Sequence, residues 1–205
     1  MGTNSKIIDI MTSQYPGAHQ KSVYTGKSII YGGSQGRLQA TGNGLVYCLE
    51  SYYNKFNKTV KGKTYIIQGL GNVGYYTAKY LQELGGIMLG CGDHTGYYII
   101  NEKYKKTGIV FTDIVNHFKH NKSLANIKLN NVKNVNKNDF FKVKCDIIIP
   151  CAMEMQITKE IASNIQTKLI VEGANGPISR DAELILIERN IHIIPDILAN
   201  SGGVI

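Results

Sequence analysis

The sequence predicts an α/β protein in which a doubly wound, mainly parallel sheet follows an N-terminal helical segment. Three observations support this fold class. Short β-branched runs alternate with stretches of helical periodicity through most of the 205 residues. A glycine-rich turn joins the first of these runs directly to a helical pattern. Small polar loops follow several later runs, where the carboxyl ends of parallel strands would lie.

The N-terminal quarter predicts helices and loops. Residues 5–14 carry apolar side chains at helical spacing, with Ser5 as the expected cap. The stretch 16–36 is loop-like, since it opens on Pro-Gly and closes on a glycine-rich run. A long amphipathic helix is expected over 37–56, and a short linker follows it.

The remainder predicts a βα series. Strands are expected at 64–68, 86–91, 146–149, 168–172 and 191–194, and helices at 72–84, 110–120, 159–165 and 179–190. Thr158 is the expected cap of the helix over 159–165. The Tyr- and Ile-rich piece before residue 110 is irregular, and the Asn/Lys-rich segment 121–139 is interpreted as an exposed, variable excursion.

The glycine-rich turn has the pattern Gly-x-Gly-x-x-Gly between an apolar β-type run and a helix. Gly69 permits a tight turn off the strand, Gly71 lets a pyrophosphate approach the backbone, and Gly74 lets the helix pack closely on the strand. The helix N-terminus adds unpaired N–H groups and the positive end of its dipole. These features predict a Rossmann-like, dinucleotide-binding turn.

The length of the chain allows one moderately large domain with a proper core. We expect a dinucleotide-binding domain over 59–205, and a helical or hinge segment over 1–58 that packs on it. No apolar run approaches the roughly 18–20 residues that cross a bilayer, and the first six residues lack an apolar signal core. A soluble, cytoplasmic protein without a membrane partner is therefore expected.

The net charge of +8 raises the question of nucleic-acid binding. Much of the excess lies in one segment, 119–144, where lysines are mixed with asparagine, isoleucine and tyrosine. This resembles compositional drift more than a shaped basic patch, so no nucleic-acid partner is expected.

The sequence predicts no metal site. His117 and His120 form an isolated His-x-x-His among lysines, without a nearby carboxylate, and a solvated helix face is the simpler interpretation. The cysteines show no Cys-x-x-Cys spacing, and three adjoin strand-like runs where a thiol is usually a small buried hydrophobe. The four cysteines of the chain are Cys48, Cys91, Cys145 and Cys151.

Asp93 is the candidate for the adenosine ribose. It follows the predicted strand 86–91 and lies nineteen positions after Gly74. A carboxylate there can accept hydrogen bonds from both ribose hydroxyls and repels a 2′-phosphate, which favours NAD over NADP. His94 beside it could soften that preference, and a surface-turn aspartate is the alternative interpretation.

Three further candidates follow later predicted strands. Ala152 lies in a small-residue stretch that could border an adenosine or ribose. Asn175 and Asn200 stand in glycine-bounded loops and can each offer an amide to a ribose or a nicotinamide. The alternative is that each asparagine is only a turn residue.

Four motifs together resemble the glutamate/leucine/phenylalanine/valine dehydrogenases. They are Gly-Gly-Ser-Gln-Gly-Arg at 32–37 with Ala-Thr-Gly at 40–42, Gln-Gly-Leu-Gly-Asn-Val-Gly at 68–74, Glu-Gly-Ala-Asn-Gly-Pro at 172–177, and Ile-Pro-Asp-Ile-Leu-Ala-Asn-Ser-Gly-Gly at 194–203. The last two look specifically like glutamate dehydrogenase. Asn43 and Ser201 depart from the family, which often has Arg and usually has Ala there.

The resemblance implies a role for eight residues. Thr41 would meet the nicotinamide carboxamide, Arg37 would lie near substrate or cofactor, Asn72 and Val73 would face the pyrophosphate, Asp93 would hold the adenosine ribose, Ala152 would border the cofactor, and Asn175 and Asn200 would contact the nicotinamide half. Arg37 and Asn200 are the substrate-side candidates, and no catalytic residue is identified.

The implied activity is NAD(P)-dependent oxidative deamination of L-glutamate to 2-oxoglutarate and ammonia. The family's Gly-Gly-x-Lys-Gly-Gly substrate loop is not found in the sequence, and the chain is expected to be the cofactor half, truncated at both ends and inactive alone. Glutamate would then bind only with a substrate domain supplied, through an oligomer or a full-length subunit. The alternatives are a non-catalytic nucleotide-binding or partner module and a partial gene product.

Overall fold

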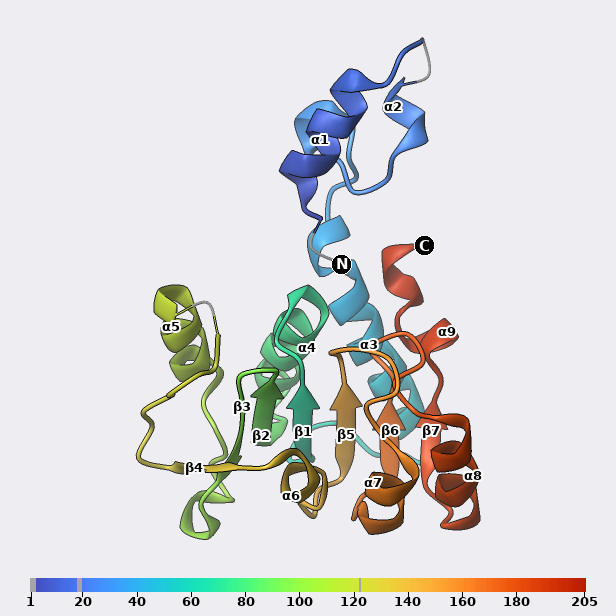
Figure 1. The fold of residues 1–205 in the computed structure, drawn as a ribbon. Coiled ribbons are helices and arrows are strands. Elements are labelled where there is room, and N and C mark those ends of the chain that lie inside the picture. Colours follow the sequence, from blue (N-terminus) through green and yellow to red (C-terminus); the bar gives the residue numbers. More distant parts are fainter. Residues whose placement is uncertain (1–2, 18–19, 122) are drawn as a thin grey trace. The chain divides into compact units, whose positions relative to one another are not determined.

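The computed structural model describes residues 3–17, 20–121 and 123–205 (Figure 1). The chain forms two compact units, Met1–Ala40 and Thr41–Ile205. Their border falls inside a helix, whereas the domain border predicted from sequence falls after residue 58 and stays a prediction. Within the described ranges, no helix is long and apolar enough to span a membrane.

The first unit contains α1 (Ser5–Gln14), α2 (Gln20–Val23) and the 3₁₀ turn η1 (Ile29–Tyr31). The predicted helix 5–14 is confirmed, but its cap is Asn4, whose side-chain oxygen accepts from the Ile7 N–H at 3.1 Å. Ser5 was the wrong cap because it is already helical. The predicted loop 16–36 holds α2 and η1, and its residues 18 and 19 lie outside the described ranges.

The second unit is built on a seven-stranded sheet in the order β4-β3-β2-β1-β5-β6-β7. The strands are β1 (Thr64–Gln68), β2 (Ile87–Asp93), β3 (Gly96–Ile100), β4 (Val132–Val135), β5 (Ile147–Pro150), β6 (Leu169–Val171) and β7 (His192–Ile194). Strand β1 pairs in parallel with β2 on one side and β5 on the other. The strand order therefore reverses at β1, where ligands of such sheets bind.

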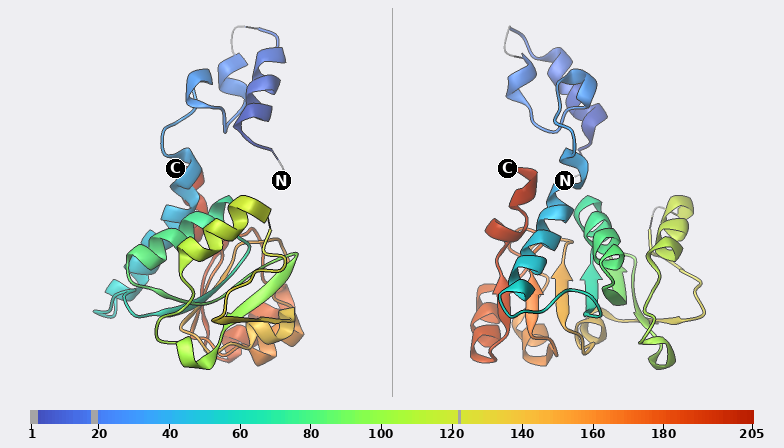
Figure 2. Two further views of the ribbon diagram at one scale, coloured as in Figure 1. Left: turned by 90° about the vertical axis from the view of Figure 1, so that its left-hand side faces the viewer. Right: turned by 180° about the vertical axis from the view of Figure 1, so that it is seen from behind.

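Helices cover both faces of this sheet, which confirms the doubly wound, mainly parallel prediction. Figure 2 shows α4 and α5 on one face and α6 and α7 on the other. The helices are α3 (Arg37–Asn54), α4 (Asn72–Glu83), α5 (Phe111–Asn121), α6 (Lys137–Phe141), α7 (Lys159–Asn164), α8 (Arg180–Glu188) and α9 (Asp196–Ala199), with 3₁₀ turns η2 (Glu102–Tyr104) and η3 (Ser201–Gly203).

The core lies along the central strands. Ile66 and Ile67 of β1 and Ile147 to Ile149 of β5 are at most 1% exposed, because a parallel strand is covered on both faces. Cys91 and Cys145 are also buried, and burial raises the pKa of each thiol to about 12. These two cysteines behave as the small buried hydrophobes that the sequence predicted.

Two sequence interpretations were wrong on one side of the sheet. The piece before residue 110 contains β3, which pairs antiparallel with β2, and the segment 121–139 contains β4 and most of α6. Phe140 is fully buried in α6, against the Tyr97 ring at 5.1 Å between centroids and beside Gly90. Because Phe140 directly follows the Asn/Lys-rich stretch and packs on the sheet, this stretch is part of the fold rather than an excursion.

Candidate cofactor-binding site

The glycine turn follows β1 at the point where the strand order reverses. Gly69 has φ of +90°, and a Cβ there would lie 2.7 Å from the Ala152 nitrogen. A Cβ at Gly74 would overlap the Gly69 carbonyl oxygen, so the first turn of α4 packs directly on the backbone of the turn. Both positions require glycine for steric reasons.

Gly71 is different because nothing of the protein occupies the space beside it. It is the N-cap of α4 with φ −65° and ψ −166°, and no atom lies within 4 Å of an added Cβ. Because glycine has no side chain, it makes no side-chain capping hydrogen bond, and Asn72 and Val73 follow as the first helical residues. The first amides of α4 and the open space at Gly71 form a cradle that suits a phosphate group.

Asp93 is the last residue of β2 and is only 8% exposed. One carboxylate oxygen accepts from the Thr95 N–H at 2.7 Å and the Thr95 hydroxyl at 2.5 Å. The other oxygen accepts from the Leu124 N–H at 3.0 Å. Asp93, the residue predicted to bind the adenosine ribose, therefore also fastens the β2–β3 turn to the segment after α5.

Thr41 and Arg37 lie on the same helix but in different compact units. Thr41 is half-buried in the second unit, one residue before Gly42, where a Cβ would lie 2.6 Å from that of Tyr76 on α4. This close approach fixes the part of α3 that follows Thr41 against α4. Arg37 is the first residue of α3 and belongs to the first unit.

Ala152 lies in the loop after β5 and contacts the glycine turn. Its nitrogen and α-carbon, at 2.7 and 2.8 Å, are two of the three atoms nearest to the Cβ position of Gly69. The preceding residue donates its backbone N–H to the Gln68 carbonyl at 2.6 Å, which ties this loop to the end of β1. The sequence predicted Ala152 as a border of the site, and the structure brings it to the turn.

Asn175 and Asn200 come from different strand-end loops and meet. The Asn200 amide donates to the Asn175 side-chain oxygen at 2.6 Å. Asn175 is exposed in the loop after β6, and Asn200 directly follows α9, the helix after β7. Two amides that are 25 positions apart in the sequence thus form one polar group at the carboxyl edge of the sheet.

Sequence reasoning missed Gln68, the last residue of β1. It is 2% exposed, and its amide nitrogen donates to the Tyr97 hydroxyl and to the Gln156 side-chain oxygen, both at 3.0 Å. The same Gln156 oxygen accepts from the Lys137 ammonium at 3.0 Å. The sequence did contain a signal for these contacts. A glutamine at the end of an apolar strand is expected to be buried, and a buried polar side chain requires hydrogen-bond partners.

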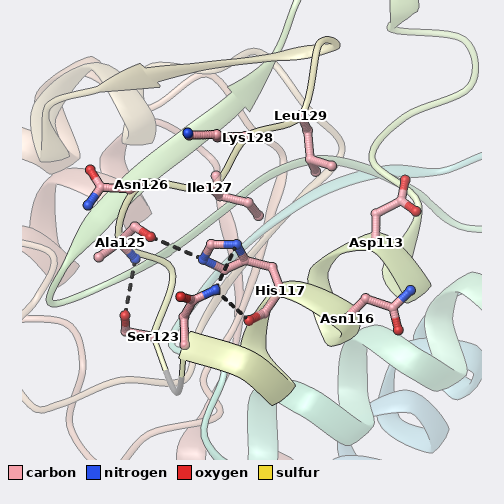
Figure 3. A pocket seen from close by; sticks show the side chains of 10 residues that line it. Asp113, Asn116, His117, Ser123, Ala125, Asn126, Ile127, Lys128 and Leu129 are labelled. Atoms are coloured by element: carbon pink, nitrogen blue, oxygen red, sulfur yellow. Dashed lines mark hydrogen bonds between the residues drawn. The ribbon is translucent and has the colours of Figure 1, made fainter.

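A separate cavity of about 640 Å³ lies between α5 and residues 123–129 (Figure 3). His117 projects toward it and makes a 3.1 Å hydrogen bond to the Ala125 carbonyl oxygen. None of the predicted cofactor residues lines this cavity. Within the described ranges, no three His, Cys, Asp or Glu side chains gather to hold a metal ion.

Comparison with known protein families identifies the family that the sequence motifs resemble. The model of the glutamate/leucine/phenylalanine/valine dehydrogenases matches residues 32–205. The chain belongs to this family. Its four motifs and its sheet order therefore have a common explanation, and the resemblance seen in the sequence is confirmed.

Two individual relatives of this chain are both glutamate dehydrogenases. The NAD-specific glutamate dehydrogenase of Clostridioides difficile is 35% identical over all of this chain and 49% of its own length. The NADP-specific enzyme of Saccharolobus shibatae is 40% identical over 90% of this chain and 42% of its own length. The chain thus spans about half the length of these curated relatives.

A solved structure supports the fold. The hetero-hexameric glutamate dehydrogenase of Thermus thermophilus superposes with a TM-score of 0.87 at 24% identity, over 100% of this chain and 47% of that one. The sheet order and the helices on both faces are therefore an arrangement already seen in a solved dehydrogenase.

Proposed function

We propose that this chain is the cofactor-binding part of a glutamate dehydrogenase. In this proposal residues 59–205 bind NAD(H) across the carboxyl ends of the central strands, and residues 1–58 are a hinge segment. The observation that supports it most is the glycine turn, where Gly69 and Gly74 are forced by the backbone but Gly71 faces empty space. A glycine that no protein contact requires is explained by a ligand that approaches it closely.

The residues fit a dinucleotide at several points. The first amides of α4, at Asn72 and Val73, would hold the pyrophosphate. Ala152 would border the cofactor, and Thr41 would meet the nicotinamide carboxamide. The paired amides of Asn175 and Asn200 would orient the same half, since together they present donors and acceptors at one edge.

The reaction proposed for the whole enzyme is the oxidative deamination of L-glutamate to 2-oxoglutarate and ammonia. A bound nicotinamide would supply the hydride acceptor. Arg37 and Asn200 are the substrate-side candidates. We expect this chain by itself to bind cofactor without turning over glutamate, and to bind glutamate only when a substrate domain is supplied in an oligomer or by a longer subunit.

The choice between NAD and NADP depends on Asp93. Its carboxylate would accept from a ribose and would repel a 2′-phosphate, which favours NAD. The relatives include an NAD-specific and an NADP-specific enzyme, so the family as a whole does not decide the question. We propose NAD as the cofactor, with NADP as the alternative.

The proposal is tested by Gly71→Ala. Because an added Cβ at Gly71 touches no protein atom and φ is −65°, the variant should fold with an unchanged melting temperature. It should nevertheless bind NADH at least about tenfold more weakly, since the methyl group would occupy the space of the pyrophosphate.

The measurement is a titration that follows the cofactor's own fluorescence, with thermal melts beside it. Wild-type chain that does not bind NADH, or a Gly71→Ala variant that binds as well as wild type, would contradict the proposal. Oxidation of glutamate by the purified chain at a normal rate would overturn the expectation that it is inactive alone.

A further inference from the structure

The two asparagine-bearing loops are connected through a buried carboxyl group that the roles proposed above do not use. Glu172 follows β6 directly and is 8% exposed. Its side-chain oxygen accepts from the Asp196 backbone N–H at 2.9 Å, at the first residue of α9. Glu172 thereby fastens the end of β6 to α9, the helix that directly precedes Asn200.

A second carboxyl group continues this connection back to the first loop. The Asp196 side chain accepts from the Gly176 backbone N–H at 2.8 Å, and Gly176 is the neighbour of Asn175. Asn200 then donates to Asn175 at 2.6 Å. These contacts connect the ends of the two loops, and we call the connected residues the carboxylate latch: Glu172, Asp196, Gly176, Asn175 and Asn200.

The environment of Glu172 opposes its negative charge. Burial and the nearby acids Asp196 on α9 and Glu183 on α8 raise the pKa of Glu172 to about 7, although the Asp196 N–H acts in the opposite direction. None of the ion pairs within residues 3–17, 20–121 and 123–205 includes Glu172. Among the described residues, no cation therefore pairs with the charge that Glu172 gains near neutral pH.

We propose that Glu172 is a positioning residue whose neutral carboxyl group keeps the carboxylate latch closed, and whose ionisation loosens the two loops and weakens binding of the nicotinamide half of the cofactor. The inference rests on the proposed function for its effect on binding. The main physical cause is burial, because an ionised Glu172 is deprived of water as long as the contact stays closed, so that opening the contact stabilises the charge. Repulsion from the charges of Asp196 and Glu183 adds to this effect, while the hydrogen bond from the Asp196 N–H opposes it.

The matched ligands are NADH and ADP-ribose, which share the adenosine half and the pyrophosphate. ADP-ribose lacks the nicotinamide that the latch would position. From about pH 6 to about pH 8.5, we expect the wild-type affinity for NADH to fall at least about fivefold, with little change in the affinity for ADP-ribose. A parallel fall for both ligands would overturn the inference.

The matched variants are Glu172→Gln, Glu172→Ala and Glu188→Gln. Glutamine still accepts from the Asp196 N–H but carries no charge, so NADH binding should stay tight and lose its pH dependence. Alanine removes the acceptor and should weaken NADH binding at every pH. Glu188 is an exposed acid at the end of α8, and its glutamine variant should keep the wild-type profile.

Hydrogen exchange at the Asp196 and Gly176 amides tests the latch without any cofactor. Protection of both amides, corrected for intrinsic exchange, should fall between the two pH values in wild type and stay constant in Glu172→Gln. Equal profiles in the two proteins would refute the latch. If the wild type and Glu172→Gln differ in this way but the wild-type chain binds no NADH, the proposed function is refuted while the latch itself is supported.

Discussion

The two halves of the predicted cofactor site are built in different ways. The glycine turn after β1 is positioned by backbone contacts, and its geometry depends on side chains that are absent at Gly69 and Gly74. The loops after β6 and β7 are positioned by polar side chains, through Glu172, Asp196 and the two asparagines. A site built by steric exclusion is insensitive to pH, whereas one built on buried carboxyl groups is not.

The largest expected effect falls on the sterically built half. Gly74→Ala would place a methyl group on the Gly69 carbonyl oxygen, and α4 would have to move away from β1. We expect the free energy of unfolding to fall by about 3 kcal/mol or more. Urea unfolding of this variant beside Gly71→Ala is the measurement, since Gly71→Ala changes the same turn without a clash. Similar stabilities for the two variants would contradict this account.

Asp93→Ser should have the next largest effect. Serine cannot replace all three hydrogen bonds from Thr95 and Leu124, and a buried N–H left without a partner costs about 1–3 kcal/mol. The same variant should raise binding of NADPH relative to NADH, because the charge that repels a 2′-phosphate is gone. Denaturant unfolding and paired cofactor titrations measure the two effects, and an unchanged NADPH-to-NADH ratio would count against the ribose role.

The pH dependence of stability should follow Glu172. Its pKa is about 7 in the folded protein against 4.5 for an unperturbed group, so the folded state binds more protons between these values. The stabilisation is therefore fully present below about pH 4.5 and is lost as the pH rises through about 7, by on the order of 1 kcal/mol. Unfolding at the two ends of this window should show that decline in wild type and not in Glu172→Gln. A decline of equal size in both proteins would assign it to other groups.

The smallest expected effect on stability belongs to Asn175→Ala. Its side chain is exposed and contributes one hydrogen bond to Asn200, so the free energy of unfolding should change by no more than about 0.5 kcal/mol. NADH binding should weaken severalfold if the paired amides hold the nicotinamide half. Binding that matches wild type would remove Asn175 from the site.

The sequence predicted the parallel part of the fold well because its strands are continuous apolar runs. Strand β1 and helix α1 have their predicted bounds, and the later strands differ by one or two residues. The antiparallel strands β3 and β4 were missed. β4 has only four residues and two of them are exposed, so no apolar run marks it in the sequence. Phe140 packs on that side of the sheet, and its partner Tyr97 lies far away in the sequence.

The candidate site could be predicted residue by residue but not as an arrangement. The glycine motif and the strand-end residues Ala152, Asn175 and Asn200 are local signals, and the structure brings Ala152 to the turn and the asparagines to each other. The second task of Asp93, holding Leu124, and the connection from Glu172 to Asp196 depend on long-range contacts. No local pattern encodes such a pair.

The two outer strands of the sheet have a consequence for association between chains. β4 carries an exposed lysine and an exposed asparagine at its centre, and β7 at the opposite edge is only three residues long. A long, flat and apolar edge would offer its open backbone groups to a strand of another molecule, and neither edge provides one. The two edges of the sheet are therefore poor templates for edge-to-edge pairing with another chain.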